Sequence, residues 1–293
     1  MGDCAVGFIG TGAMGEHMCR NVARSGRYAV RAFDLDAEPL ERLAGDGVET
    51  ATDAAELASR SDVVILSLPG GPEVEQVAEE VLLPAGRPGW IVIDMSTTPV
   101  GLTRTVAARL GERYGRFLDA PVARTQQAAV DGTLSIMVGG DAGDLEQVRG
   151  ILECMGSDIT HCGGVGAGQI AKILNNMVVF QNGVAIAEAL TIGERSGMEP
   201  AVLLDVINRS SGASFVGQNH AARAMVPNRF PLRQFPARYA LKDLSYALML
   251  AGDGGVRAPG AELAGRLLQQ AIDMGCGDEY WPTIIKAVRS GTK

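Results

Sequence analysis

The sequence predicts an α/β protein in which a doubly wound, mostly parallel sheet is followed by an all-α domain. From Ala5 to about Thr160, short runs of β-forming residues alternate with helical patterns, which is the order of βαβ units. After a cluster of glycines between Gly163 and Gly168, nearly every segment has a helical pattern. The length of 293 residues is enough for two domains. We therefore expect a boundary near Gly164, with domains 1–164 and 165–293.

The two halves of the sequence predict different secondary-structure elements. Expected strands in the first half are Ala5–Ile9, Ala29–Asp34, Val63–Leu68, Trp90–Asp94 and Leu134–Val138. Expected helices between them are Ala13–Arg24, Ala54–Ala58, Pro72–Val81 and Thr103–Arg113. The second half begins with a helix of roughly thirty residues that ends at Ser196, where Gly197 and Pro200 are stop signals. Further helices are expected at Pro200–Asn208, Ala240–Leu250 and Ala261–Met274.

The composition is that of a folded, water-soluble chain. Hydrophobic residues make up 46% of it and charged residues 20%, which excludes an intrinsically disordered protein. The formal charge of −8 comes from 34 acidic and 26 basic residues, so nucleic acid is not an expected partner. The longest apolar stretch, residues 170–192, contains Lys172, Glu188 and several amide side chains, so we expect no membrane span.

The cysteines and histidines form no recognisable disulfide or metal pattern. The five cysteines, at positions 4, 19, 154, 162 and 276, are odd in number and include no C-x-x-C pair. We expect reduced thiols and, since the first residues do not resemble a secretory signal, a cytoplasmic protein. His17, His161 and His220 are scattered along the chain, so no metal is expected.

A glycine-rich turn follows the first expected strand directly. Gly10, Gly12 and Gly15 have the G-x-G-x-x-G spacing, with Thr11, Ala13 and Met14 between them. In such a turn the first glycine allows a tight bend, the second lets the backbone approach a pyrophosphate, and the third lets the helix pack on the strand. The helix N-terminus then faces the negative charge of the phosphates. The segment therefore predicts a dinucleotide-binding Rossmann domain.

Asp34 closes the next strand, nineteen positions after Gly15. A carboxylate there accepts hydrogen bonds from the adenosine ribose hydroxyls and repels a 2′-phosphate, which favours NAD over NADP. Arg31, nearby on the same strand, leaves NADP as the alternative. In the purely structural interpretation, the glycines serve only a tight turn and Asp34 is a surface carboxylate.

Four segments together resemble the β-hydroxyacid dehydrogenase family, and the resemblance extends over essentially the whole chain. They are the glycine-rich turn, Asp119–Val122 continuing to Asp131–Leu134, Gly168–Asn176, and Lys242–Leu244. The resemblance implies a Rossmann domain, a helical C-terminal domain like that of 6-phosphogluconate dehydrogenase, and a homodimer or homotetramer. It also implies reversible, NAD(P)-linked oxidation of a small 3-hydroxy acid to its semialdehyde, as in 3-hydroxyisobutyrate dehydrogenase.

The family's catalytic lysine and asparagine match Lys172 and Asn176. The chemistry of these residue types agrees, because residues four apart on a helix lie on one face and can reach one bound molecule. A partly desolvated lysine has a lowered pKa and can take the hydroxyl proton during hydride transfer. Asn175, on a different face, is expected to bond backbone or to touch substrate from the side. In the alternative interpretation, Lys172 lies on a solvated face.

The family's cofactor contacts also map onto this sequence. The resemblance places Leu68 and Pro69 against the adenosine and its ribose, and Thr97 on the nicotinamide side. It places Lys242 near the nicotinamide and its ribose. Without the resemblance, each of these would be an ordinary loop or helix residue.

The loop Ala123–Thr125 departs from the family pattern. Most relatives have Ser-Gly-Gly there and use it to hold the substrate carboxylate, whereas this chain has Ala123, Arg124 and Thr125. Arginine pairs two oxygens of a carboxylate or sulfonate. A similar arginine occurs in the sulfolactaldehyde reductases, although Val179 replaces a serine which that branch uses. We expect this loop to bind the anionic end of the substrate. Pairing of Arg124 with a protein acid or with the cofactor is the alternative.

Two other functions fit the same fold. An imine reductase normally has another residue where Lys172 stands. A non-catalytic dinucleotide-binding protein would keep the glycine-rich turn and Asp34 without needing Lys172, Asn176 and Lys242 together. The joint presence of these three residues favours an enzyme.

Overall fold

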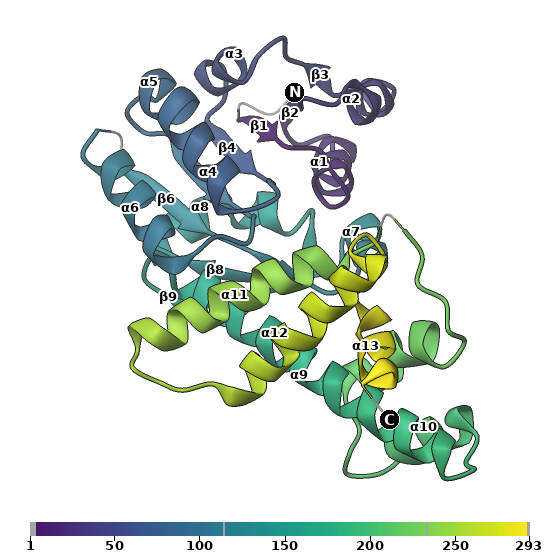
Figure 1. Ribbon diagram of the computed structural model, residues 1–293. Helices are drawn as coiled ribbons and strands as arrows, with labels where there is room; N and C mark the ends of the chain where they lie inside the picture. Colours follow the sequence, from purple (N-terminus) through teal and green to yellow (C-terminus); the bar gives the residue numbers. More distant parts are fainter. Residues whose placement is uncertain (1–3, 114, 233, 292–293) are drawn as a thin grey trace. The chain divides into compact units, whose positions relative to one another are not determined.

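The computed structural model of the chain describes residues 4–113, 115–232 and 234–291 (Figure 1). The chain divides into two compact units after Lys172. The division lies inside helix α9 (Ala167–Arg195), whereas the change of pattern in the sequence lies near Gly164. The first turn of α9 belongs to the first unit because Asp119 and Gln169, both fully buried, hydrogen-bond it there.

The first unit is built on one mixed sheet. Its described residues form nine strands in the order β3-β2-β1-β4-β5-β6-β8-β7, with β9 paired to β8. The strands β1 to β6 run parallel, whereas β8 is antiparallel to β6 and β7. The strand bounds are β1 Ala5–Ile9, β2 Ala29–Phe33, β3 Glu49–Thr50, β4 Val63–Leu66, β5 Ile91–Asp94, β6 Arg116–Asp119, β7 Val122–Ala123, β8 Leu134–Gly139 and β9 Gly156–Gly163. The strand order reverses between β1 and β4, where doubly wound folds bind ligands.

Helices cover both faces of this sheet because its central strands are buried on both sides. Val64 and Ile65, neighbours on β4, lie in opposite hydrophobic clusters, one containing Leu57 and the other Met18. Successive residues of a strand point to opposite faces, so an unbroken apolar run fits a sheet between two layers. The helices of this unit are α1 Gly15–Arg24, α2 Ala37–Ala44, α3 Ala54–Ser59, α4 Gly71–Val77, a π-helix Ala78–Leu82, α5 Leu83–Ala85, α6 Val100–Gly111, α7 Gln126–Val130 and α8 Ala142–Leu152.

The second unit is all-helical over its described residues. Phe180 of α9 packs edge-on against Trp281, with ring centroids 5.4 Å apart, and both are buried. Gly183 lies against the same indole, since a Cβ at this position would come within 2.5 Å of the ring. The remaining elements are α10 Pro200–Asn208, a π-helix Val216–Met225, α11 Ala237–Asp253, α12 Pro259–Ala271, a second π-helix Ile272–Cys276, a 3-10 turn Trp281–Thr283 and α13 Ile284–Ser290.

The structure confirms the expected fold class and adds elements that the sequence pattern did not predict. The parallel sheet and the helical second unit occur as expected, and Pro200–Asn208 has the predicted bounds. Unexpected elements include the antiparallel placement of β8 and several helices and strands. The unpredicted elements are α2, α5, α7, α8, α13, β3, β6, β7, β9 and the π-helix Val216–Met225.

Helix α9 is long and apolar enough to cross a membrane by length and composition, with a mean hydropathy of 1.2 over its best window. Its contacts are those of a core helix. Ile173 and Phe180 are buried in the protein, and Asn176 makes a buried hydrogen bond to Asp243. These polar and apolar contacts both favour a helix packed inside a folded domain.

Candidate active site

The glycine-rich turn has the close backbone approaches that its motif requires. Gly10 has a φ of +94°, and a Cβ there would lie 2.4 Å from the carbonyl oxygen of Ser67. At Gly15 a Cβ would lie 2.3 Å from the carbonyl oxygen of Gly10, so the helix α1 starts tightly against the strand. By contrast, Gly12 is exposed, and the space that its Cβ would fill is open. An open backbone position at a helix start fits the pyrophosphate of a dinucleotide.

Hydrogen bonds hold the Asp34 side chain against the glycine-rich turn. Its Oδ2 accepts hydrogen bonds from the Thr11 backbone N–H at 2.5 Å and from the Thr11 hydroxyl at 3.1 Å. Its Oδ1 accepts the N–H of Asp36 at 2.9 Å. The side chain of Thr11 is fully buried, so it acts by orienting Asp34. Leu35, which is 96% exposed, follows directly and offers no positive charge for a 2′-phosphate.

Ala13 and Met14 complete the turn. Ala13 is exposed, and its carbonyl accepts a hydrogen bond from the Gln126 amide at 3.3 Å. Met14 is half-buried and packs against the main hydrophobic core of the unit. The two residues thus join the turn to α7 and to the core.

The loop after β5 places Thr97 at the carboxyl edge of the sheet. Thr97 is half-buried between Ser96 and Thr98, which are both buried. The Ser96 hydroxyl accepts the backbone N–H of Leu68 at 2.9 Å, which ties this loop to the loop after β4. Leu68 and the exposed Pro69 therefore lie beside the Thr97 loop, as expected for residues along one cofactor.

Two buried carboxylates to which the sequence analysis gave no role support this edge. Asp94 accepts hydrogen bonds from the Ser96 N–H at 2.9 Å and the Thr98 hydroxyl at 2.8 Å. Burial raises the pKa of Asp94 to about 6, against the effect of these hydrogen bonds. Asp119 accepts the N–H groups of Gly166 and Gln169, and burial also raises its pKa. The partners of Asp119 lie 47 and 50 residues later in the chain, so no local pattern indicates them.

Lys172 and Asn176 lie one turn apart on α9, so their side chains share a face of the helix. Lys172 is half-buried and Asn176 is 7% exposed. The Asn176 Nδ2 donates to Asp243 Oδ2 at 2.7 Å, and its Oδ1 accepts from the Asn175 amide at 3.2 Å. The sequence analysis used Asp243 only as part of a motif, and the structure makes it the hydrogen-bond partner of Asn176.

Lys242 lies beside Asp243 on α11 in the second unit. Its Nζ is 3.1 Å from Asp243 Oδ1, and it lies 5.7 Å and 5.3 Å from the ring centroids of Tyr239 and Tyr246. The aromatic faces attract the ammonium. The Lys242 charge is therefore held by one buried carboxylate and two rings.

The loop Ala123–Thr125 contains a residue with an unusual backbone conformation. Arg124 has a φ of +86°, a left-handed conformation that favours glycine. Its guanidinium donates to the Thr133 carbonyl at 2.5 Å and to the Ser157 hydroxyl at 3.2 Å, and it lies 3.7 Å from Asp158. The Thr125 hydroxyl caps α7 by accepting the N–H of Ala128. In this structure the Arg124 side chain thus contacts the protein.

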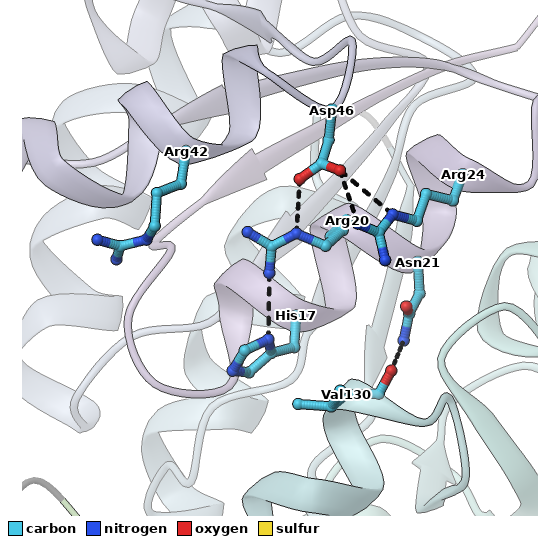
Figure 2. Close-up of a pocket in the computed structure, with 7 residues that line it drawn as sticks. All are labelled: His17, Arg20, Asn21, Arg24, Arg42, Asp46 and Val130. Atoms are coloured by element: carbon cyan, nitrogen blue, oxygen red, sulfur yellow. Dashed lines mark hydrogen bonds and ion pairs between the residues drawn. The ribbon is translucent and has the colours of Figure 1, made fainter.

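A pocket of about 380 Å³ lies in the first unit and contains none of the expected site residues. Figure 2 shows the side chains that line it. In it, Asp46 lies between Arg20 and Arg24, with Arg20 Nε 2.6 Å from the carboxylate. Glu16 pairs with Arg20 and also with Arg42. Arg42 also pairs with Glu38, so three carboxylates match the three guanidiniums, and the cluster joins α1 to α2 without surplus positive charge. Its lining residues are His17, Arg20, Asn21, Arg24, Arg42, Asp46 and Val130.

Among the described residues, no group of three or more His, Cys, Asp or Glu side chains could hold a metal ion. His161 instead contacts the carbonyl oxygen of Gly140 at 2.9 Å.

Two family models match this chain, one over its N-terminal part and one over its C-terminal part. Residues 5–164 match the model of the NAD binding domain of 6-phosphogluconate dehydrogenase. Residues 166–288 match the model described as NAD-binding of NADP-dependent 3-hydroxyisobutyrate dehydrogenase. Together the two matches cover nearly the whole chain.

Three relatives agree with these matches. The chain is 32% identical to 2-(hydroxymethyl)glutarate dehydrogenase of Eubacterium barkeri, covering 96% of this chain and 93% of the relative. It is 33% identical to NAD-dependent L-serine dehydrogenase of Pseudomonas aeruginosa, covering 96% of each. A structure of 3-hydroxyisobutyrate dehydrogenase from Mycobacterium tuberculosis with L-serine superposes with a TM-score of 0.89 at 33% identity, covering 99% of this chain and 100% of that one.

The chain belongs to the β-hydroxyacid dehydrogenase family. It is an NAD-dependent oxidoreductase of hydroxy acids, as the sequence analysis expected. The resemblance drawn from four motifs is thereby confirmed over nearly the whole length of the chain.

Proposed function

We propose that this dehydrogenase oxidises a small acid with a hydroxymethyl group on the carbon that bears a carboxylate, and reduces the matching semialdehyde. The names of the relatives support this class. Hydroxyisobutyrate, hydroxymethylglutarate and serine all contain that unit and differ in the third substituent, which is a methyl, a carboxyethyl or an amino group. A sulfonate in place of the carboxylate is the alternative, because Arg124 would bind either anion.

NAD fits the first unit and supplies, when bound, the carbon that accepts a hydride. Gly12 leaves open backbone for the pyrophosphate, and Asp34 is oriented at the end of β2 for the ribose hydroxyls. The exposed Leu35 brings no charge to a 2′-phosphate, which supports NAD over NADP. The proposed nicotinamide side is the Thr97 loop.

The mechanism rests on one observation. Lys172 shares a helix face with Asn176, and hydrogen bonds hold the Asn176 side chain in place. As the hydride leaves the hydroxymethyl carbon, the hydroxyl proton passes to the Nζ of Lys172, and reduction returns it. Asn176 has one N–H committed to Asp243 and one Oδ1 lone pair committed to Asn175. Its second N–H and its second lone pair are the groups that orient the substrate oxygen.

Replacement of Lys172 tests this mechanism. Lys172→Ala is expected to bind NAD nearly as the parent protein does and to lose roughly 10²–10⁴-fold in kcat, which is the usual contribution of a positioned proton-transfer group. The assay uses the three hydroxy acids of the relatives and sulfolactaldehyde, followed by NADH absorbance. A near-normal kcat in Lys172→Ala would contradict the mechanism, and exclusive activity on the sulfonate would favour the alternative substrate.

We further propose that the active form is at least a homodimer. Apolar side chains are exposed on the second unit: Val178 is 52% and Ile192 is 66% exposed on α9, and Val202 is 54% exposed on α10. Exposed apolar side chains of this kind favour association. Light scattering and activity at the same dilution test it, because a fully active monomer would contradict the proposal.

We propose a reducing, cytoplasmic environment on the basis of the cysteines. All five are free, and burial raises the pKa of Cys4 and of Cys162, which favours unreactive thiols. Microscopy of the tagged protein tests the location.

A further inference from the structure

The side chain of Gln169 makes two hydrogen bonds around Thr97. Its Oε1 accepts the backbone N–H of Thr98 at 3.0 Å, and its Nε2 donates to the carbonyl of Ser96 at 2.8 Å. Gln169 is fully buried, and so is Thr98. One amide therefore fixes the peptide groups on both sides of Thr97 while the Thr97 side chain stays accessible.

The backbone of Gln169 is fixed as firmly as its side chain. Its N–H donates to Asp119 Oδ2 at 2.8 Å, and the other oxygen of Asp119 accepts the N–H of Gly166 at 2.7 Å. Asp119 ends β6, four residues before Ala123, the start of the expected substrate loop. Gly168 permits this approach, because a Cβ there would lie 2.3 Å from the carbonyl oxygen of Met137.

Gln169 also lies three residues before Lys172 on α9, about 4.5 Å along the helix axis. A buried residue hydrogen-bonded through its amide oxygen, its amide nitrogen and its backbone N–H leaves the first turn of α9 little freedom to slide or rotate against the Thr97 loop. Two hydrogen bonds of the Gln169 side chain thus set the distance between the Thr97 loop and the first turn of α9, and a third, from its backbone, ties that turn to Asp119.

We propose that Gln169 is a positioning residue that sets the placement of Lys172 relative to the nicotinamide side of the cofactor site. This inference rests on the proposed role of Lys172. Hydride and proton transfer from one substrate must occur together, and a misplacement of about 1 Å can cost on the order of 10²-fold in rate. Gln169 therefore acts on turnover through Thr97 and Lys172, without touching the substrate.

The test replaces Gln169 in two ways and uses a matched control. Gln169→Met keeps the length of the side chain and removes both hydrogen bonds, and Gln169→Glu keeps an acceptor for Thr98 N–H and loses the donor to Ser96. Gln147→Met is the control, because Gln147 is an exposed glutamine of the same unit whose side chain accepts from Arg116. If the methionine variant does not fold, the glutamate variant carries the test.

Two measurements separate positioning from support of the fold. In the protein without cofactor or substrate, amide hydrogen exchange should quicken in residues 95–98 and 166–172 of the Gln169 variants, with strand β1 unchanged. In turnover, kcat per folded enzyme should fall about 10- to 100-fold while KM for NAD changes less than about 3-fold. The primary isotope effect on kcat, measured with substrate deuterated at the oxidised carbon, should rise to the value for rate-limiting hydride transfer.

A lowered melting temperature with parental kcat, parental isotope effect and parental exchange at 95–98 would overturn the inference. Lys172→Ala, assayed in parallel, tells the two hypotheses apart. If Lys172→Ala keeps its kcat, the proposed mechanism fails. If Lys172→Ala loses kcat and both Gln169 variants keep theirs, only the positioning role is wrong.

Discussion

Asn176 donates a 2.7 Å hydrogen bond to the buried carboxylate of Asp243, 67 residues later in the chain. Asp243 is 2% exposed, and its other oxygen lies 3.1 Å from the ammonium of Lys242. One carboxylate thus holds both the asparagine of the proposed proton-transfer pair and a lysine expected at the cofactor.

Loss of this carboxylate should therefore affect turnover. Asp243→Ala is expected to lower kcat roughly 10- to 100-fold, less than Lys172→Ala, because Asn176 loses its orientation while the proton acceptor remains. Steady-state kinetics measure this effect. Asp253→Ala, an exposed position at the end of the same helix, is the control. Equal kcat for both variants would show that Asn176 needs no support from Asp243.

The choice of cofactor should depend on Asp34. The protein is expected to have a higher kcat/KM with NAD than with NADP, and Asp34→Ser should raise the NADP-to-NAD ratio at least about tenfold by removing the repulsion of the 2′-phosphate. Asp36→Ser is the control, because serine can still cap α2. A parent enzyme that prefers NADP would contradict the role given to Asp34.

Arg124 provides two separable predictions. If it binds the substrate anion, Arg124→Ala should raise the substrate KM about tenfold or more, Arg124→Lys should raise it less, and NAD affinity should not change. If Arg124 instead stabilises the fold through Thr133 and Ser157, Arg124→Ala should lower the melting temperature and leave the substrate KM unchanged. Arg124→Gly should be more stable than Arg124→Ala by about 1 kcal/mol, because a φ of +86° suits glycine.

His220 should make the protein less stable at acidic pH. Burial, together with the charge of Arg223, lowers its pKa to about 4, and its Nδ1 is hydrogen-bonded to the Tyr280 hydroxyl. The unfolded chain, with an ordinary histidine pKa of 6.5, binds the proton first, so stability is lost as pH falls from about 6.5 towards 4. The loss is at most about 3 kcal/mol.

The measurement is urea unfolding between about pH 4 and pH 7 for the parent and for His220→Asn. The asparagine can still accept the tyrosine hydroxyl and does not titrate. The unfolding free energy of the parent minus that of His220→Asn should rise as pH rises from about 4 to about 6.5. A difference that is constant over this range would contradict the lowered pKa of His220.

The features that the sequence makes visible are those that depend on local spacing. The glycine-rich turn needs positive φ and close approach within a few residues, and Asp34 follows at a spacing set by one βα unit. The family resemblance singles out Lys172 and Asn176, and helical spacing adds that the two lie on one face.

The contacts that the sequence did not reveal join residues far apart in the chain. Asp119 meets Gln169 50 residues later, and Gln169 reaches back 73 residues to Ser96. Composition and periodicity carry no information on such pairs, since only tertiary packing brings them together. The short strand β7 and the antiparallel direction of β8 were missed for the same reason, because pairing depends on partners elsewhere in the sheet.

Helix α9 crosses the boundary between the two units, and this determines which fragments of the protein can be prepared. A fragment that ends at Gly164 would delete Gly166 and Gln169, whose N–H groups neutralise the buried Asp119. Asp119 would then lose both hydrogen-bond donors and the residues of α9 that cover it, so the carboxyl end of β6 would be exposed. A dinucleotide-binding fragment prepared for ligand screening should therefore continue through Lys172, and a cut at the glycine cluster should yield insoluble protein.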